Sequence, residues 1–416
     1  MNSSWKSIKL IDALQKTDTI NPQKTPDFSF EYVDVSSVCN KKFVIRETST
    51  IRGEDAPSRA RRFIRAGDIL LATVRPTLKR IAQVPEYLDG QICSTGYFVL
   101  RPKDFLEGKF LFYFLFTEHF MGAMEKLQKG ASYPAVNDRD VSSQTILIPP
   151  LPEQKQIVAI LDEAFEGIDR TIANTKKNLA NARELFKSYL NAIFTQNSDG
   201  WEAKRIEDVC EAIIDCINKT ASTIDDPSPF KMIRTTNVRN GYVNLDSVKY
   251  VTEDTYRQWT RRQLPKKGDV LLTREAPMGE VGMLLTDDQV FLGQRIVSYR
   301  TDSNKLNNKF LLYALQSNDL QRQIKAFASG STVQHMRVPD TKNLRIAIPS
   351  LSVQKQVVQN LDVLLFQAQR LEAIYQQKLA ALNELKQTIL QKAFTGELTV
   401  DTANQATKTA EGAIAA

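Results

Sequence analysis

The chain has 416 residues, of which 42% are hydrophobic, enough for two or three domains with buried cores. It has no run of eighteen apolar residues, and its first residues lack an apolar core, so we expect neither a membrane span nor a signal peptide. The net charge of +7, with a pI of about 9.0, suits a nucleic-acid partner without requiring one.

Cysteine and histidine are scarce in this chain. Its four cysteines and two histidines follow no metal-ligand spacing and no disulfide framework. The sequence therefore predicts no metal site, and it favours a reducing, cytoplasmic location.

A first domain is expected over residues 1–147. It opens with a strand-like alternation at Trp5–Leu10, and Gly67-Asp68 precedes a short apolar run, as a tight turn does before a buried strand. A helix is expected from Phe110, and a small polar loop from Gly130.

A long helix is expected over residues 148–196. The Pro-rich segment Ile148–Pro152 precedes it, and Pro is tolerated in a first helical turn. From Glu153 to Thr195 there is no Pro and the only Gly is Gly167. Such a helix is a rod of roughly 60 Å.

The second half of the chain repeats the first about 200 residues later. Ile348-Pro349-Ser350-Leu351 matches Ile148-Pro149-Pro150-Leu151, and Lys267-Gly268-Asp269 matches Ala66-Gly67-Asp68. Self-similarity with so long a period indicates a duplicated unit of one domain and one helix. We therefore expect a second domain over 197–347, a second long helix over 348–398 and a disordered tail over 399–416.

Each long helix carries an apolar seam, which favours a coiled coil. The alternative is two separate amphipathic helices, each packed on its own domain. The first seam contains Leu161, Ala164, Ile168, Leu179, Ala182, Phe186, Tyr189 and Ile193, with a weaker middle at Thr171, Thr175 and Asn178. The second contains Leu361, Leu364, Ala368, Leu371, Tyr375, Lys378, Leu382, Leu385 and Ile389, and only Lys378 breaks it.

Basic residues gather near the expected loops, where the two copies diverge. Arginine and lysine supply phosphate contacts, whereas base edges supply specificity. Arginine suits guanine, and asparagine or glutamine suits adenine. The candidate phosphate contacts are Arg59, Arg61, Arg62, Arg75, Lys79 and Arg80 in the first domain, and Arg257, Arg261, Arg262 and Arg274 in the second. The candidate base readers are Tyr133, Asn137, Asn237, Gln334 and Arg337. For any one of them the alternative is a solvated surface side chain.

Patterns typical of catalysis are missing from the sequence. It has no Gly-rich phosphate loop and no dinucleotide fingerprint, and its histidines, His119 and His335, occupy unrelated points of the repeat. Asp68 and Asp269 recur after glycine, but an Asp in a turn before a strand is the simpler interpretation. We therefore expect no catalytic residues in this chain.

The segment from Ile148 to Ile157, followed by a long helix, resembles the specificity subunit of type I restriction–modification systems. The Gly-Asp strand and the second copy, which ends in Ala393–Leu398, extend this resemblance over about residues 1–398. The second copy departs from the family pattern, with Ser350 for the second proline and Ser352-Val353 before Gln354. The target sequence is not implied by the resemblance.

The resemblance implies two target-recognition domains of mixed α/β type, separated by two long antiparallel coiled-coil helices in an internal pseudo-two-fold repeat. Each domain would read one half of a bipartite asymmetric site in double-stranded DNA. Two methyltransferase subunits, which carry S-adenosylmethionine, would dock on the helices, and motor-nuclease (restriction) subunits could join them; this chain itself would hold no cofactor. The candidate partner contacts are Ile157, Ile160, Ile172, Val357 and Val358.

Three other functions stay open at this point. The same architecture could serve a methylation-only complex. A helical scaffold could join two protein-binding domains and never touch DNA. A free-standing enzyme is the third, and the missing catalytic patterns speak against it.

Overall fold

The computed structural model describes residues 5–195, 200–217, 219–327 and 335–398. The chain divides into two compact units, residues 1–176 with 377–416 and residues 177–376. Gln334 and the expected tail at 399–416 lie outside the described residues. No helix within the described ranges is long and apolar enough to cross a membrane.

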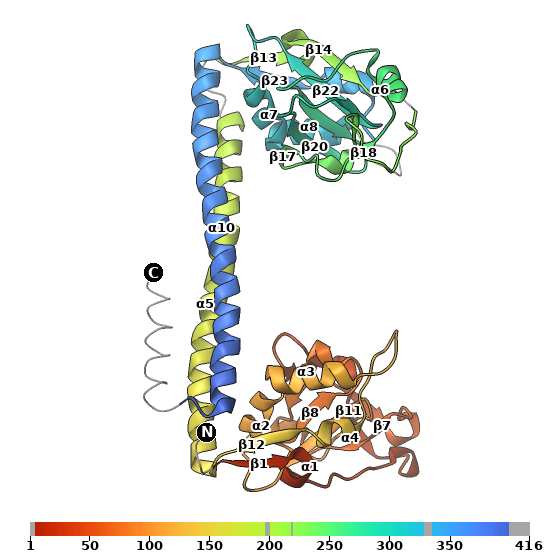
Figure 1. The fold of residues 1–416 in the computed structure, drawn as a ribbon, viewed down its shortest axis with the longest axis vertical. Coiled ribbons are helices and arrows are strands. Elements are labelled where there is room, and N and C mark those ends of the chain that lie inside the picture. The colour runs from red at the N-terminus through yellow and green to blue at the C-terminus, as the bar shows by residue number, and fades with distance from the viewer. Residues whose placement is uncertain (1–4, 196–199, 218, 328–334, 399–416) are drawn as a thin grey trace. The chain divides into compact units, whose positions relative to one another are not determined.

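The first unit contains a mixed α/β domain (Figure 1). Its sheets have the orders β2-β11-β8-β9 and β6-β3-β10-β7, and β1 pairs antiparallel with β12. The strands are β1 Lys6–Lys9, β2 Leu14–Gln15, β3 Ser29–Val33, β4 Val38–Cys39, β5 Val44–Ile45, β6 Ser49–Arg52, β7 Ala60–Phe63, β8 Ile69–Ala72, β9 Ile81–Gln83, β10 Ile92–Ser94, β11 Tyr97–Pro102 and β12 Thr145–Ile148. The helices are α1 Leu10–Ala13, α2 Gly108–Phe114, α3 Glu118–Leu127 and α4 Asp138–Ser142.

The second unit contains a domain of the same type. Its sheets have the orders β14-β22-β19-β20-β17-β16 and β18-β15-β21, and β13 pairs antiparallel with β23. The strands are β13 Glu202–Arg205, β14 Cys210–Asp215, β15 Lys231–Ile233, β16 Val238–Arg239, β17 Gly241–Val243, β18 Lys249–Tyr250, β19 Val270–Arg274, β20 Met278–Met283, β21 Val290–Leu292, β22 Ile296–Thr301 and β23 Arg345–Ile348. The helices are α6 Glu253–Thr260, α7 Asn308–Gln316, α8 Asn318–Phe327 and α9 Val338–Lys342.

The glycine-aspartate turns lead into buried strands, as the sequence predicts. Asp68 is buried before β8, and both of its oxygens accept hydrogen bonds from Arg101, at 2.7 and 2.8 Å. Asp269 makes the same bidentate pair with Arg300 before β19, at 2.7 and 2.9 Å. Because each carboxylate is occupied by a guanidinium and a turn amide, these aspartates hold the fold together.

Two long helices follow the domains, α5 at Leu151–Thr195 and α10 at Leu351–Thr395, each of 45 residues. Pro149-Pro150 directly precedes α5 and Pro349-Ser350 directly precedes α10. α10 is followed by Gly396 at φ +77°, the left-handed conformation that commonly ends a helix. The long helices of the sequence prediction are therefore confirmed.

The two helices pack side by side and antiparallel (Figure 1). In the first unit Lys386 of α10 pairs with Asp169 of α5 at 2.8 Å, and in the second unit Arg183 pairs with Glu372.

The domain cores reach into the helices. In the first unit Leu161 and Ile168 of α5 and Leu390 of α10 belong to the core of the first domain. In the second unit Leu190 and Leu361 belong to the core of the second. The helices therefore pack on one another, as a coiled coil does, and also on the domains, as separate amphipathic helices would.

The predicted seam is wrong at two positions. Leu371 and Tyr189 are exposed, whereas Leu190 is buried. Near the end of α5 the globular domain covers the helix, so the buried face follows the domain surface there. In the middle of α5 the buried hydroxyls of Thr171 and Thr175 donate to the carbonyl oxygens four residues earlier.

Candidate nucleic-acid interface

Two loops of the first domain meet beside the end of β8. Val136 donates its backbone N–H to the carbonyl of Thr73 at 3.0 Å, and Arg75 donates to the carbonyl of Pro134 at 2.7 Å. Lys129 and Ala135 exchange both backbone hydrogen bonds at 2.9 Å, which closes the second loop on itself. The predicted residues Arg75 and Tyr133, far apart in sequence, are thereby brought together.

Arg75 and Tyr133 form an exposed cation–ring pair. The guanidinium carbon of Arg75 lies 4.6 Å from the centre of the Tyr133 ring, and its Nη2 donates to the Ser132 carbonyl at 2.9 Å. Tyr133 is 70% exposed. Arg75 and Lys79 both have positive φ, so the chain turns sharply here. The short loop between them therefore carries two cationic side chains. Such a pair offers a phosphate contact and a face on which a base can stack.

The other cations of the first domain divide into free and engaged groups. Arg59 is exposed, and its guanidinium contacts no partner among the residues that the structure describes. Arg62 pairs with Asp138, Arg61 donates to the Ala60 carbonyl, and Arg80 donates to the carbonyls of Val35 and Val38. These three arginines stabilise loops and are less available to a ligand.

Asn137 has a structural task as the N-cap of α4. Its side-chain oxygen accepts the backbone N–H of Asp140 at 2.9 Å, and Asp140 accepts the N–H of Asn137 in return. Because base reading by asparagine uses both ends of the amide, this cap takes away half of that capacity.

In the second domain Arg274 ends β19 and holds the neighbouring loop. Its Nη1 donates to the Met336 carbonyl at 2.9 Å, and Met336 donates its N–H to the Arg274 carbonyl at 3.0 Å. Arg274 is only 8% exposed. The proposed phosphate contact at Arg274 is therefore corrected, because a buried guanidinium bound to the fold cannot reach DNA.

Asn237 is also corrected. It is 2% exposed; its oxygen accepts the Arg234 N–H at 2.9 Å and its amide donates to the Asn244 carbonyl at 3.0 Å. The amide oxygen and the amide nitrogen both form hydrogen bonds inside a turn, so neither is available to a base.

Apart from Arg274, the candidate arginines of the second domain lie around α6 and α9. Arg257 pairs with Glu253 within α6, and Arg337 makes a bidentate pair with Asp340. Arg261, at the end of α6, is exposed and its guanidinium meets no partner in the described ranges.

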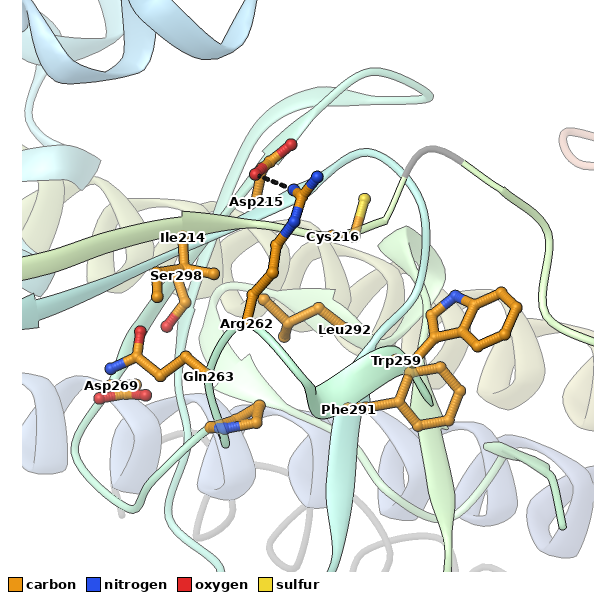
Figure 2. A pocket seen from close by; sticks show the side chains of 11 residues that line it. Ile214, Asp215, Cys216, Trp259, Arg262, Gln263, Asp269, Phe291, Leu292 and Ser298 are labelled. Atoms are coloured by element: carbon orange, nitrogen blue, oxygen red, sulfur yellow. Dashed lines mark hydrogen bonds and ion pairs between the residues drawn. The ribbon is translucent and has the colours of Figure 1, made fainter. Parts of the chain in front are cut away.

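The side chain of Arg262 forms an ion pair with Asp215 of β14 at 2.7 Å (Figure 2). The pair closes one side of a cavity of about 20 Å³, which Trp259 and Leu292 also line. That volume admits a water molecule and excludes a nucleotide base.

An acidic group that the sequence did not single out stands beside Arg274. The Glu275 carboxylate lies 3.1 Å from Arg295 Nε and 3.3 Å from His335 Nδ1. At the matching position of the repeat the first domain has Val74. The sequence signal that could have identified Glu275 is this difference, an acidic residue in one copy of the loop where the other copy has valine. The two domains thus present different chemistry on the same scaffold.

The predicted partner contacts are covered by the protein's own domains. Ile157 and Val358 are buried in the domain cores, so neither is open to a partner, and this prediction is corrected. Ile160, Ile172 and Val357 are partly buried against the same cores. The exposed large apolar residues of the long helices are Leu185 and Tyr189 on α5 and Val353, Val363, Phe366, Leu371 and Ile374 on α10.

The sequence matches the model of the type I restriction modification DNA specificity domain twice, at residues 20–181 and 198–390. It is 23% identical over 307 residues to the EcoBI specificity subunit of Escherichia coli, covering 67% of this chain and 64% of that subunit, less than two thirds of its length. It is 24% identical over 333 residues to the MjaVIII specificity subunit of Methanocaldococcus jannaschii, covering 76% of each chain.

Two solved structures share the fold over nearly the whole chain. The HsdS subunit from Thermoanaerobacter tengcongensis is 30% identical with a TM-score of 0.66, and 96% of this chain and 98% of that chain are covered. A chain from a structure describing complex assembly and conformational transition of the type I R-M system is 28% identical with a TM-score of 0.83, covering 95% and 98%.

Proposed function

Because this chain belongs to the type I restriction–modification DNA specificity family, we propose that it selects the DNA sequence on which a type I complex acts. The observation that carries this proposal is the double match, in which each half of the chain supplies one recognition domain and one long helix. The reaction itself belongs to partner subunits, and this chain contributes recognition and assembly.

The two domains, residues 1–147 and 197–347, each read one half of a split, asymmetric target. The helices at 148–196 and 348–398 hold the two readers at a set separation. What supports this division is that the copies share buried turns and strands but carry different side chains at the loops, Arg75 with Tyr133 in one and Glu275 with Arg295 in the other. Identical loops would favour a symmetric target instead.

The surface that contacts DNA is centred on exposed cations near these loops. In the first domain these are Arg59 and Arg75 with Tyr133, beside the half-buried Lys79. In the second domain they are Arg257 and Arg261 around α6 and Arg337 beside α9. Phosphate contacts of this kind make binding depend steeply on salt.

Two methyltransferase subunits, which carry S-adenosylmethionine, dock on the long helices, and restriction subunits can join them. The exposed apolar side chains of α10, among them Val363, Phe366 and Ile374, support a helix-mediated contact. Without partners these side chains remain exposed to water, so the chain binds DNA tightly only within the assembled complex.

The test is methylome sequencing of cells that express the partner methyltransferase with and without this chain. The proposal expects methylation of a split motif that depends on this chain. Methylation that is the same in both cultures would overturn it.

A non-DNA-binding scaffold is the second candidate, favoured by the arginines that the fold itself occupies, such as Arg62 and Arg262. Changing Arg59, Arg75 and Arg261 to Glu separates the two. A DNA reader loses methylation while the complex still assembles, whereas a scaffold keeps both.

A further inference from the structure

Each domain is fastened to the start of its own long helix by a buried glutamine. Gln154 of α5 is 0% exposed. Its Oε1 accepts the backbone N–H of Glu107 at 2.8 Å, and its Nε2 donates to the carbonyls of Phe105 and Pro149 at 2.8 and 2.9 Å. One side chain thereby joins the loop before α2, the end of β12 and the first turn of α5.

A second contact lies eight residues further along α5, roughly 12 Å along the helix axis. There Asp162 accepts the hydroxyl of Tyr113 at 2.5 Å on one oxygen and the ammonium of Lys109 at 2.7 Å on the other. Both donors project from α2. Burial and the hydrogen bond to Asp162 raise the pKa of Tyr113, so the phenol stays protonated and keeps donating at neutral pH.

The second unit repeats the arrangement. Gln354 is 0% exposed, accepts the Asn307 N–H at 2.8 Å and donates to the carbonyls of Lys305 and Pro349 at 3.0 and 2.9 Å. Asp362 accepts from Tyr313 and from Lys309, each at 2.6 Å. All the side chains involved recur 200 residues after their counterparts, whereas the loop residues around the two domains differ.

A domain held at one point can rotate about it in any direction, whereas a domain held at two separated points on a rigid rod can turn only about the line that joins them, and the apolar contacts between domain and helix oppose that remaining turn. The glutamine fixes where the domain sits on the helix, and the Asp–Tyr–Lys contact two turns away fixes its rotation. The glutamine is fully buried, so its hydrogen bonds are costly to break, and the second contact adds a charge-assisted pair whose groups are only partly buried. The pair of contacts is therefore a rigid mount.

We propose that this two-point mount, Gln154 with Asp162, Tyr113 and Lys109, and its repeat at Gln354 with Asp362, Tyr313 and Lys309, sets which spacing between half-sites the protein accepts. This inference rests on the proposed function as a reader of split DNA sites. These are positioning residues: they touch no DNA and act through the angle and height of each domain on its helix.

The geometry of DNA explains why the mount matters. One additional base pair between the half-sites moves the second half by about 3.4 Å and turns it by roughly 35°. A rigidly mounted domain cannot follow that shift without losing base contacts. A domain that can tilt or rotate on its helix can follow it, so a loosened mount should relax spacing and leave the half-site sequences unchanged.

The experiment uses the assembled complex and a plasmid library that carries the two half-sites at every spacing from well below to well above the preferred one. The double variant Lys109→Met with Tyr113→Phe removes both donors to Asp162, which is partly exposed and can be hydrated instead. Lys309→Met with Tyr313→Phe does the same in the second domain. Arg170→Met is the matched control, because Arg170 pairs with Glu166 on the exposed surface of α5.

The measured quantity is the ratio of methylation at one base pair from the preferred spacing to methylation at that spacing. We expect this ratio to rise roughly tenfold in either double variant, equivalent to about 1.4 kcal/mol, and to stay unchanged in the control. Tyr113→Phe alone, which removes only a hydroxyl, should raise this ratio by a smaller factor. It is measured beside the double variants, so that the proposal can still be tested if a double variant folds poorly.

An unchanged ratio in the folded variants, at any overall level of methylation, would overturn the mount while leaving the reader of split sites intact. If the unmodified complex methylates no split site at any spacing, the proposed function fails instead.

Discussion

At the scale of single residues, the arginines of this protein divide into those that hold the fold and those that face solvent. Arg101 of β11 and Arg300 of β22 pair with the buried aspartates Asp68 and Asp269, and Arg274 joins two loops. Arg59, Arg75 and Arg261 are exposed and have no carboxylate partner among the described residues. Affinity for DNA should therefore depend on the second group, while stability depends on the first.

Arg75→Ala should weaken only the half-site that the first domain reads. The change removes a cation and the group that holds the Tyr133 ring, at a cost of about 1–3 kcal/mol if a base contact is lost. Binding of the complex to duplexes altered in one half-site at a time measures this. Arg257→Ala in the other domain is the control, and equal losses at both half-sites would contradict the division of labour.

Gln154→Ala should destabilise the first unit. It leaves one buried N–H and two carbonyls without their partner, and each orphaned group costs about 1–3 kcal/mol. Chemical denaturation of the complex, compared with the exposed neighbour Gln156→Ala, measures it. A loss no larger than that of Gln156→Ala would mean that water replaces the amide.

The sequence predicted the basic loops but could not tell free arginines from engaged ones. Arg59 and Arg62 are three residues apart in the sequence, yet Arg62 forms an ion pair with Asp138 whereas Arg59 is exposed to solvent. That difference depends on a partner 76 residues away, which no local pattern encodes. Asn237 was misjudged for the same reason, because its turn partners become visible only in three dimensions.

At the scale of elements, α5 and α10 combine two kinds of packing. Toward the domains they bury Leu161 and Leu361, and toward each other they place Asp169 beside Lys386. Periodicity predicted the helices well because no proline interrupts them, but it misjudged Leu371 and Tyr189. A seam defined by spacing alone ignores the domain that covers one side of each helix.

Phe366→Glu should weaken association with the methyltransferase subunit and leave folding unchanged. Phe366 is 66% exposed on α10, so its replacement removes no core contact, yet a buried charge in an interface costs about 2 kcal/mol or more. Titration by analytical ultracentrifugation measures association, with the exposed neighbour Gln367→Glu as the control. Equal affinity for both variants would place the contact on another face.

At the scale of the whole molecule, the internal repeat was the most informative feature of the sequence. The 200-residue offset predicted two domains, two helices and their order, and all of these are present. Gln154, Asp162 and their partners also recur at that offset, but their contacts could not be inferred until the strands and helices were placed.

Inserting one heptad into each long helix should lengthen the accepted gap between half-sites. Each helix has 45 residues, roughly 68 Å, and seven more add about 10 Å, close to three base pairs. A heptad keeps the same helix faces in register, so both half-site sequences should persist. Methylome sequencing reads both quantities, and an unchanged gap would contradict a spacer role for the helices.

We propose that each domain reads its own half of a split target. The most direct measurement is methylome sequencing of cells that express the complex, with residues 1–147 either native or exchanged for the same region of a relative. If each domain reads its own half, one half of the split motif changes on exchange while the other half stays. A motif in which both halves change, or neither, would contradict it.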